Sequence, residues 1–106
     1  MCGFVVIIKK SKNFSLKEIE KKNILNCQKH RGPDVCKFQE KDNLIFFHNR
    51  LKIIDLSPAG NQPMISYSGK YVIIYNGEIY NYLEIRNELE ELGHQFYSIP
   101  KPSKIE

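Results

Sequence analysis

The sequence opens with Met1-Cys2-Gly3-Phe4-Val5-Val6-Ile7-Ile8, where a cysteine directly follows the initiator methionine and leads into an apolar run. The length of this run and its β-branched residues predict a strand that is buried on both faces and holds the terminus in place. Loss of Met1 would leave Cys2 with both a thiol and a free α-amine. The thiol is a candidate nucleophile, and the amine, whose unperturbed pKa is roughly 7.7 to 8.0, can accept its proton.

The composition indicates one small globular domain. The 106 residues are 42% hydrophobic and 26% charged, which argues against disordered and fibrous classes. The apolar start has no basic segment before it and no cleavage site after it, so we expect no signal peptide. No run approaches the roughly 18 apolar residues of a membrane helix. Three cysteines at irregular spacings predict reduced thiols and a cytoplasmic protein without a membrane partner.

The net charge of +4 comes mainly from lysines that are scattered along the chain. A nucleic-acid-binding protein would more often gather arginines and aromatic residues on one face. We therefore expect a solvated, lysine-rich surface and no nucleic-acid partner. A small basic nucleic-acid-binding module is the alternative, and it would bind DNA or RNA in a salt-sensitive manner.

An amphipathic helix is predicted from Ser15 to about Lys29. Ser15 and Glu18 have the spacing of a capping box, in which each side chain bonds the backbone of the other. Apolar side chains recur at near-helical spacing along this segment and would place Cys27 on the buried stripe.

Two strands are predicted after a dense turn over 30–34, namely 35–38 and 44–51, joined by a polar loop over 39–43. Arg50 lies near the end of the second strand. It could be a surface charge, or it could hold a substrate carboxylate in a bidentate grip.

A zinc site would have to use histidines and cysteines from these same segments. The candidates are Cys27, His30, Cys36 and His48. Their separations fit no standard ligand pattern, and two of them fall on expected core positions, so we expect no metal.

A strand predicted over 70–75 runs directly into Asn76-Gly77-Glu78, and the apolar spacing that follows predicts a helix over 79–92. The Asn76 carboxamide and the Gly77 amide are hydrogen-bond donors, and Gly77 leaves room for a substrate to approach. This junction is therefore a candidate oxyanion hole. Glu78 could bind a substrate ammonium or only complement the helix dipole.

Taken together, these segments resemble the start of a class II glutamine amidotransferase domain, of the kind found in glutamine-hydrolysing asparagine synthetases. The similarity covers residues 1–98. The motifs agree in identity, order and spacing, and they are Met1-Cys2-Gly3, His30-Arg31-Gly32-Pro33-Asp34, His48-Asn49-Arg50-Leu51, Ile54-Asp55-Leu56-Ser57, Gly60-Asn61-Gln62-Pro63-Met64, Tyr75-Asn76-Gly77-Glu78-Ile79-Tyr80-Asn81 and Leu92-Gly93-His94.

The resemblance implies an α+β fold, the αββα sandwich of the N-terminal-nucleophile hydrolases, and glutamine as the substrate. It implies that Cys2 attacks the glutamine side-chain amide, that Asn76 and Gly77 stabilise the oxyanion, and that Arg50 and Glu78, with Asn76, bind the substrate. In the family, a C-terminal synthetase domain uses the released ammonia, with ATP and magnesium, to convert aspartate to asparagine.

The sequence departs from the family pattern near its end. Residues 99–106 form a divergent tail, in which Lys101 stands about where the family has an aspartate that binds the substrate ammonium, and Pro100 and Pro102 prevent the following helix. We therefore expect a truncated sandwich without a synthetase domain, and no cofactor in this chain. The alternative to a working amidotransferase is an inactive remnant, or a split subunit that another chain completes.

Overall fold

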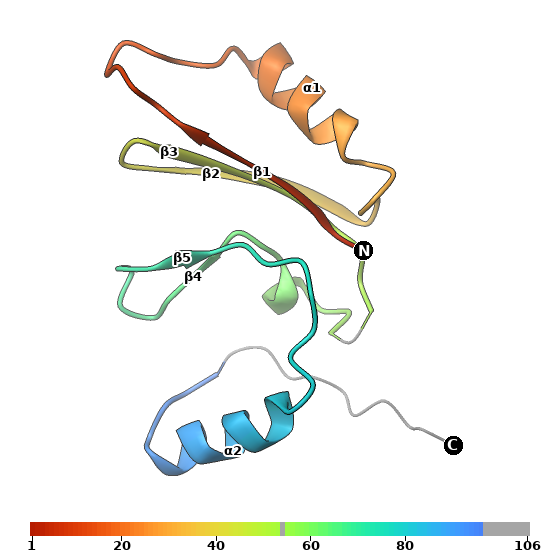
Figure 1. The fold of residues 1–106 in the computed structure, drawn as a ribbon, viewed down its shortest axis with the longest axis vertical. Helices are drawn as coiled ribbons and strands as arrows, with labels where there is room; N and C mark the ends of the chain where they lie inside the picture. Colours follow the sequence, from red (N-terminus) through yellow and green to blue (C-terminus); the bar gives the residue numbers. More distant parts are fainter. Residues whose placement is uncertain (54, 97–106) are drawn as a thin grey trace.

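The fold is a small α+β domain with two antiparallel sheets. The computed structural model describes residues 1–53 and 55–96. Its elements, in chain order, are β1 (Gly3–Ile8), α1 (Glu18–Cys27), β2 (Val35–Lys41), β3 (Leu44–Arg50), the 3-10 turn η1 (Pro58–Gly60), β4 (Met64–Ile65), β5 (Val72–Ile73) and α2 (Tyr82–Glu91). Along the longest axis the layers follow the order α1, first sheet, second sheet, α2 (Figure 1).

The first sheet has the strand order β1-β3-β2, so the two outer strands both pair with β3. Its register sets Gly3 opposite Asn49 and Lys41 opposite Leu44. The last pairing leaves a two-residue turn, in which Asp42 has a φ of 54°. Asp tolerates this left-handed conformation better than most residues. The predicted loop over 39–43 was therefore too long, because β2 continues to Lys41.

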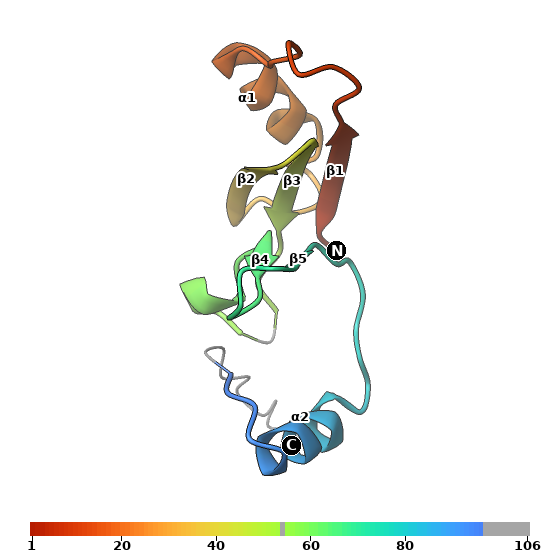
Figure 2. The same ribbon diagram turned by 90° about the vertical axis from the view of Figure 1, so that its left-hand side faces the viewer.

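Helix α1 covers one face of this sheet (Figures 1 and 2). Ile45 and Phe47, on the central strand, are the fully buried apolar side chains of the described residues. The Phe38 ring lies 5.8 Å from the Phe47 ring, and the Lys21 ammonium lies 4.8 Å from the centre of Phe38. The central strand is buried because it has a paired strand on each side and a helix above it.

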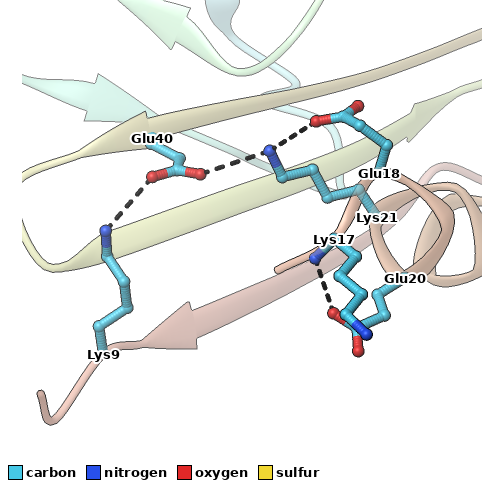
Figure 3. A network of polar contacts seen from close by, with 6 residues as sticks. All are labelled: Lys9, Lys17, Glu18, Glu20, Lys21 and Glu40. Carbon is cyan, nitrogen blue, oxygen red and sulfur yellow. Dashed lines mark hydrogen bonds and ion pairs between the residues drawn. The ribbon is translucent and has the colours of Figure 1, made fainter. Parts of the chain in front are cut away.

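Charged side chains at the surface link this helix to the two outer strands (Figure 3). Glu40 of β2 lies 3.2 Å from the Lys9 ammonium, just after β1, and 3.7 Å from Lys21 of α1. Lys21 also lies 3.1 Å from Glu18. Exposed pairs of this kind contribute about 0 to 1 kcal/mol each, so this network supports the packing but does not determine it.

The helix starts later than its sequence predicted. Lys17, at the N-cap, donates its backbone N–H to the Glu20 carboxylate at 2.7 Å, and the first helical residue is Glu18. The Ser15–Glu18 capping box was therefore wrong, because Glu20 satisfies the free backbone amide two residues further on. Cys27 is the last helical residue and is exposed, so its expected place on the buried stripe was also wrong.

The first strand is buried on one face only. Its residues Phe4, Val6 and Ile8 are 44%, 40% and 65% exposed. The alternate residues Val5 and Ile7 are half-buried, since their partners on β3 are the core residues Phe47 and Ile45. The expectation of a strand buried on both faces was therefore wrong, because β1 is an edge strand and its second face has little cover in the described part of the chain.

The second sheet is a short hairpin on the side of the first sheet away from α1 (Figures 1 and 2). β4 and β5 contain two residues each, with Met64 opposite Ile73. The strand predicted over 70–75 is therefore shorter than expected, since only Val72 and Ile73 are paired.

Helix α2 lies at the far end of the molecule from α1 (Figure 1). It starts at Tyr82 and not at Ile79, because 79–82 form a turn in which Tyr82 donates its N–H to the Ile79 carbonyl at 3.1 Å. None of its ten residues is buried. Gly93, with a φ of 92°, follows the helix in the left-handed conformation that glycine adopts easily. Of the helices in the described ranges, neither is long and apolar enough to cross a membrane.

Candidate active site

A cleft of about 540 Å³ opens where the start of β1, the end of β3 and the segment after β5 meet. It brings together the five residues that the sequence proposed for the site, which are Cys2, Arg50, Asn76, Gly77 and Glu78. The same cleft is lined by Met1, Leu51, Ile53, Asp55, Gln62, Tyr75 and Tyr80. Residues up to 79 positions apart in the chain (1 to 80) therefore share one cavity. The prediction that Lys101 takes the place of a substrate-binding aspartate lies outside the described residues.

Cys2 is positioned by the pairing of β1 with β3. The residue after β3, Leu51, donates its N–H to the Cys2 sulfur at 3.3 Å, and its carbonyl oxygen lies 3.8 Å from the same atom. Cys2 is half-buried and lines the cleft. The Leu51 backbone therefore fixes the position of the Cys2 sulfur in the cleft.

The turn over 30–34 contacts the backbone of Cys2 and the end of β3. Arg31 donates its Nε–H to the Cys2 carbonyl at 3.3 Å. Asp34 accepts the Lys52 N–H at 2.8 Å and donates its own N–H to the Arg50 carbonyl at 3.0 Å. Gly32 is buried, and a Cβ there would overlap the backbone of Asn49 and Arg50. This turn therefore fixes both Cys2 and the strand end beside it.

Arg50 is not a surface charge, because its side chain is 6% exposed. Its guanidinium donates to the Ser57 carbonyl at 2.7 Å and to the Asn61 Oδ1 at 2.7 Å, and it also donates to the Asp55 carbonyl. Gly60 lies directly against the guanidinium, where a Cβ would not fit. Arg50 therefore holds the loop over 55–61 in place while it contributes positive charge to the cleft. Its role as the carboxylate-binding residue stays a prediction.

A negative charge lies beside Arg50 in the same cleft. Asp55 accepts the Ser57 N–H at 2.8 Å. Hydrogen bonds from Ser57 lower the pKa of Asp55 below its usual value, and the positive charge of Arg50 adds to this effect. Asp55 is therefore ionised at neutral pH, and the cleft offers both a cation and an anion to a zwitterionic ligand.

The segment from Tyr75 to Glu78 also lines the cleft. Tyr75 donates its backbone N–H to the Gln62 Oε1 at 2.5 Å, and its phenol donates to the Glu78 carbonyl at 3.4 Å. A Cβ on Gly77 would lie only 2.6 Å from the Tyr75 phenol oxygen. The space that glycine leaves beside Gly77 is thus taken by this phenol group, and not only by open cleft as the sequence suggested.

His48 lies next to the cleft and is completely buried. Neither of its ring nitrogens has a hydrogen-bond partner among the described residues. Burial lowers its pKa, the nearby Arg50 charge lowers it further, and the Tyr75 backbone partly opposes this shift. His48 is therefore neutral at neutral pH. In the described ranges, no three His, Cys, Asp or Glu residues gather closely enough to hold a metal ion.

The sequence alone did not identify the supporting residues of the site. Gln62 and Asp55 were quoted within motifs, but no pattern in the sequence indicated which atoms they would contact. Gln62 bonds a backbone amide 13 residues away. Only the pairing of β4 with β5 reveals this contact, since that pairing brings the two segments together.

The comparisons with known proteins identify the family of the chain. The family model of the glutamine amidotransferase domain matches residues 1–100. The chain therefore belongs to the glutamine amidotransferase domain family. No solved structure matches it.

Several relatives of the chain are named as glutamine-hydrolyzing asparagine synthetases. The chain is 40% identical over 98 residues to asparagine synthetase (glutamine-hydrolyzing) 1 of Bacillus subtilis, a match that covers 91% of this chain and 15% of the relative. It is 36% identical over 98 residues to asparagine synthetase 3 of the same organism, with 91% and 16% covered. The nodule asparagine synthetase of Pisum sativum is 31% identical over 98 residues, with 92% and 16% covered. The chain thus spans about 15% of the length of these relatives.

Proposed function

We propose that this chain carries the glutamine-hydrolysing site of an asparagine-synthetase-type amidotransferase, with Cys2 as its nucleophile. The observation that carries the proposal is the shared cleft, which is lined by Cys2, by the Asn76–Gly77 segment and by the charged residues Arg50 and Glu78. The order of the layers, helix, sheet, sheet, helix, supports the αββα sandwich as the parent fold (Figure 1).

The chemistry follows from the groups in the cleft. Once Met1 is removed, the Cys2 α-amine takes the thiol proton, and the sulfur attacks the side-chain carbonyl carbon of glutamine. Asn76 and the Gly77 N–H stabilise the oxyanion that forms. The amine returns the proton to the leaving nitrogen, ammonia departs, and a γ-glutamyl thioester remains. Water then attacks the thioester and releases glutamate and the free thiol.

The charged residues of the cleft match the ends of the substrate. Arg50 offers a positive charge to the α-carboxylate, and Glu78 offers a negative charge to the α-ammonium. A guanidinium that is already fixed by the 55–61 loop loses little side-chain freedom when it binds a carboxylate.

The fate of the ammonia is proposed from the relatives. They are named as glutamine-hydrolyzing asparagine synthetases, and the matched region is about 15% of their length. We propose that the ammonia serves to amidate aspartate at a synthetase domain, where ATP and magnesium would act, and that this chain itself needs no cofactor.

A second candidate is a subunit that becomes active only with another chain. Phe4, Val6 and Ile8 on one face of β1 are between 40% and 65% exposed, and no residue of α2 is buried. Apolar faces of this kind are normally covered in a folded domain. A partner that supplied the covering strands would stabilise the half of the cleft that carries Asn76.

Glutamate release tests the proposal. The full chain is purified, loss of Met1 is verified by intact mass, and glutamate is measured after incubation with glutamine. We expect release by the wild type and by Cys27→Ala, since Cys27 is exposed and lies outside the cleft. We expect none from Cys2→Ala. Equal release from Cys2→Ala would overturn the proposal, and activity that arises only after a synthetase chain is added would favour the second candidate.

A further inference from the structure

The two-stranded hairpin ends just before the candidate oxyanion donors. Met64 pairs with Ile73, and Ser66 donates its N–H to the Tyr71 carbonyl at 2.9 Å. Continuing this register by two residues sets Gln62 opposite Tyr75. Alternate positions of an antiparallel pair exchange backbone hydrogen bonds, and the 62–75 position belongs to this bonded set.

At this position a side chain takes the place of the strand backbone. The Tyr75 N–H donates to the Gln62 Oε1 at 2.5 Å. The Gln62 carboxamide therefore extends the ladder by one bonded position, as far as the residue that directly precedes Asn76. Gln62 is half-buried and lines the same cleft as Cys2.

We propose that Gln62 is a positioning residue, which fixes the Tyr75–Gly77 turn so that the Asn76 and Gly77 donors face Cys2. The inference rests on the proposed function. Gln62 itself contacts no reacting atom in this proposal. It acts through the Tyr75 backbone, while the Tyr75 phenol holds the other end of the turn through the Glu78 carbonyl at 3.4 Å.

The second half of the molecule makes such a restraint necessary. β4 and β5 have only two residues each, and Tyr75 is 43% exposed, so few other contacts hold the turn. Oxyanion donors stabilise a transition state only when they are already in place, and a displacement of about 1 Å can lower the rate by about 100-fold.

Two variants distinguish the effect of the Gln62 oxygen acceptor from the effect of the size of its side chain. Gln62→Met keeps the length and volume but loses the oxygen acceptor, whereas Gln62→Glu keeps an oxygen at the same place. Gln39→Met is the matched control, because Gln39 is a half-buried glutamine of β2, far from the cleft lining. Amide hydrogen exchange at Tyr75 and steady-state kinetics with glutamine are measured for each full-length chain.

In Gln62→Met we expect the Tyr75 amide to exchange about tenfold faster or more, with the amides of β3 unchanged. We expect kcat to fall about 10- to 100-fold while KM changes less than about threefold, because the donors act in the transition state. Gln62→Glu should restore most of kcat, and Gln39→Met should match the wild type.

Unchanged exchange at Tyr75, an unchanged kcat in Gln62→Met, or an equal loss of kcat in Gln62→Glu would each overturn the positioning role. A wild type that releases no glutamate would instead overturn the proposed function for this chain. The Tyr75 exchange rate would then still decide whether Gln62 holds the turn.

Discussion

The two halves of the molecule are built differently. In the first half, strands of six and seven residues pair along their full length, and Ile45, Phe47 and Asn49 are fully buried between them and α1. In the second half, the paired strands have two residues each and α2 has no buried residue. The first half therefore has a core of its own, whereas the second depends on isolated hydrogen bonds.

The candidate site draws on both halves. Cys2 is held by the first sheet and by the Leu51 amide, so its place follows from strand pairing. Asn76 and Gly77 belong to the second half, where the Gln62 side chain bonds the preceding Tyr75 amide. Arg50 holds the loop over 55–61, which leads into this half. The comparison teaches that the candidate nucleophile, Cys2, is fixed by strand pairing, whereas the candidate oxyanion donors follow a segment that is held by a few polar contacts.

The largest expected effect is a difference in stability loss between a substitution in the first half and one in the second. Phe47→Ala removes a ring that is 1% exposed, and we expect it to lower the free energy of unfolding by about 3 to 5 kcal/mol, or to prevent folding. The matched change Leu83→Ala, on a side chain of α2 that is 48% exposed, should cost less than about 1 kcal/mol. Urea unfolding followed by circular dichroism measures both. Similar losses of stability from the two changes would contradict the view that only the first half has a core of its own.

An intermediate effect is expected at the contact between the halves. Arg50→Met keeps a long side chain but leaves the carbonyls of Asp55 and Ser57 without their donor, so we expect a loss of about 2 to 3 kcal/mol. Limited proteolysis should cut the loop over 55–61 faster in this variant, while β1–β3 stay protected.

The conservative change provides the control for this position. Arg50→Lys keeps the charge but cannot reach all three acceptors, so its loss should be about half that of Arg50→Met. A loop that stays equally resistant to protease in both variants would contradict the view that Arg50 joins the halves.

The smallest effect concerns pH. The pKa of His48 is lowered in the folded chain, so below about pH 6.5 the unfolded chain binds a proton that the folded chain does not. Stability should therefore fall as pH drops below this value, by up to about 1.4 kcal/mol per pH unit. Below the pKa of His48 in the folded chain, this histidine is protonated in both states, and it lowers the stability no further.

The variant His48→Phe removes the titrating group and keeps the volume. We expect it to flatten the stability profile below about pH 6.5. Urea midpoints at half-unit pH steps make this measurement. If stability depends on pH equally steeply in His48→Phe, burial of this imidazole is not the cause of the pH dependence.

Sequence reasoning located the strands that carry the first half and the five residues that meet in the cleft. It succeeded there because the apolar runs over 3–8 and 44–50 specify long strands. The motifs placed at their ends then share one cavity once the strands pair. The roles of these five residues in catalysis remain predictions.

It failed where tertiary contacts outweigh local signals. Glu20 and not Glu18 provides the capping carboxylate, because it bonds the Lys17 amide. Cys27 is exposed because the half-buried positions of α1 fall on Lys21, Ile24 and Leu25. No local pattern could show that Arg50 is buried by a loop that follows it, or that Gln62 replaces a strand bond at Tyr75. Such contacts depend on which segments the fold brings together.

Selective labelling of Cys2 tests the central claim most directly. The full chain, with Met1 removed, is treated with a glutamine analogue that carries an electrophile at the side-chain carbonyl position, and the labelled residue is mapped by mass spectrometry. Cys27 and Cys36 are internal controls, because both are exposed. We expect a label on Cys2 alone, slowed by added glutamine and by Asn76→Ala. Equal labelling of all three cysteines, without protection by glutamine, would contradict a glutamine site built around Cys2.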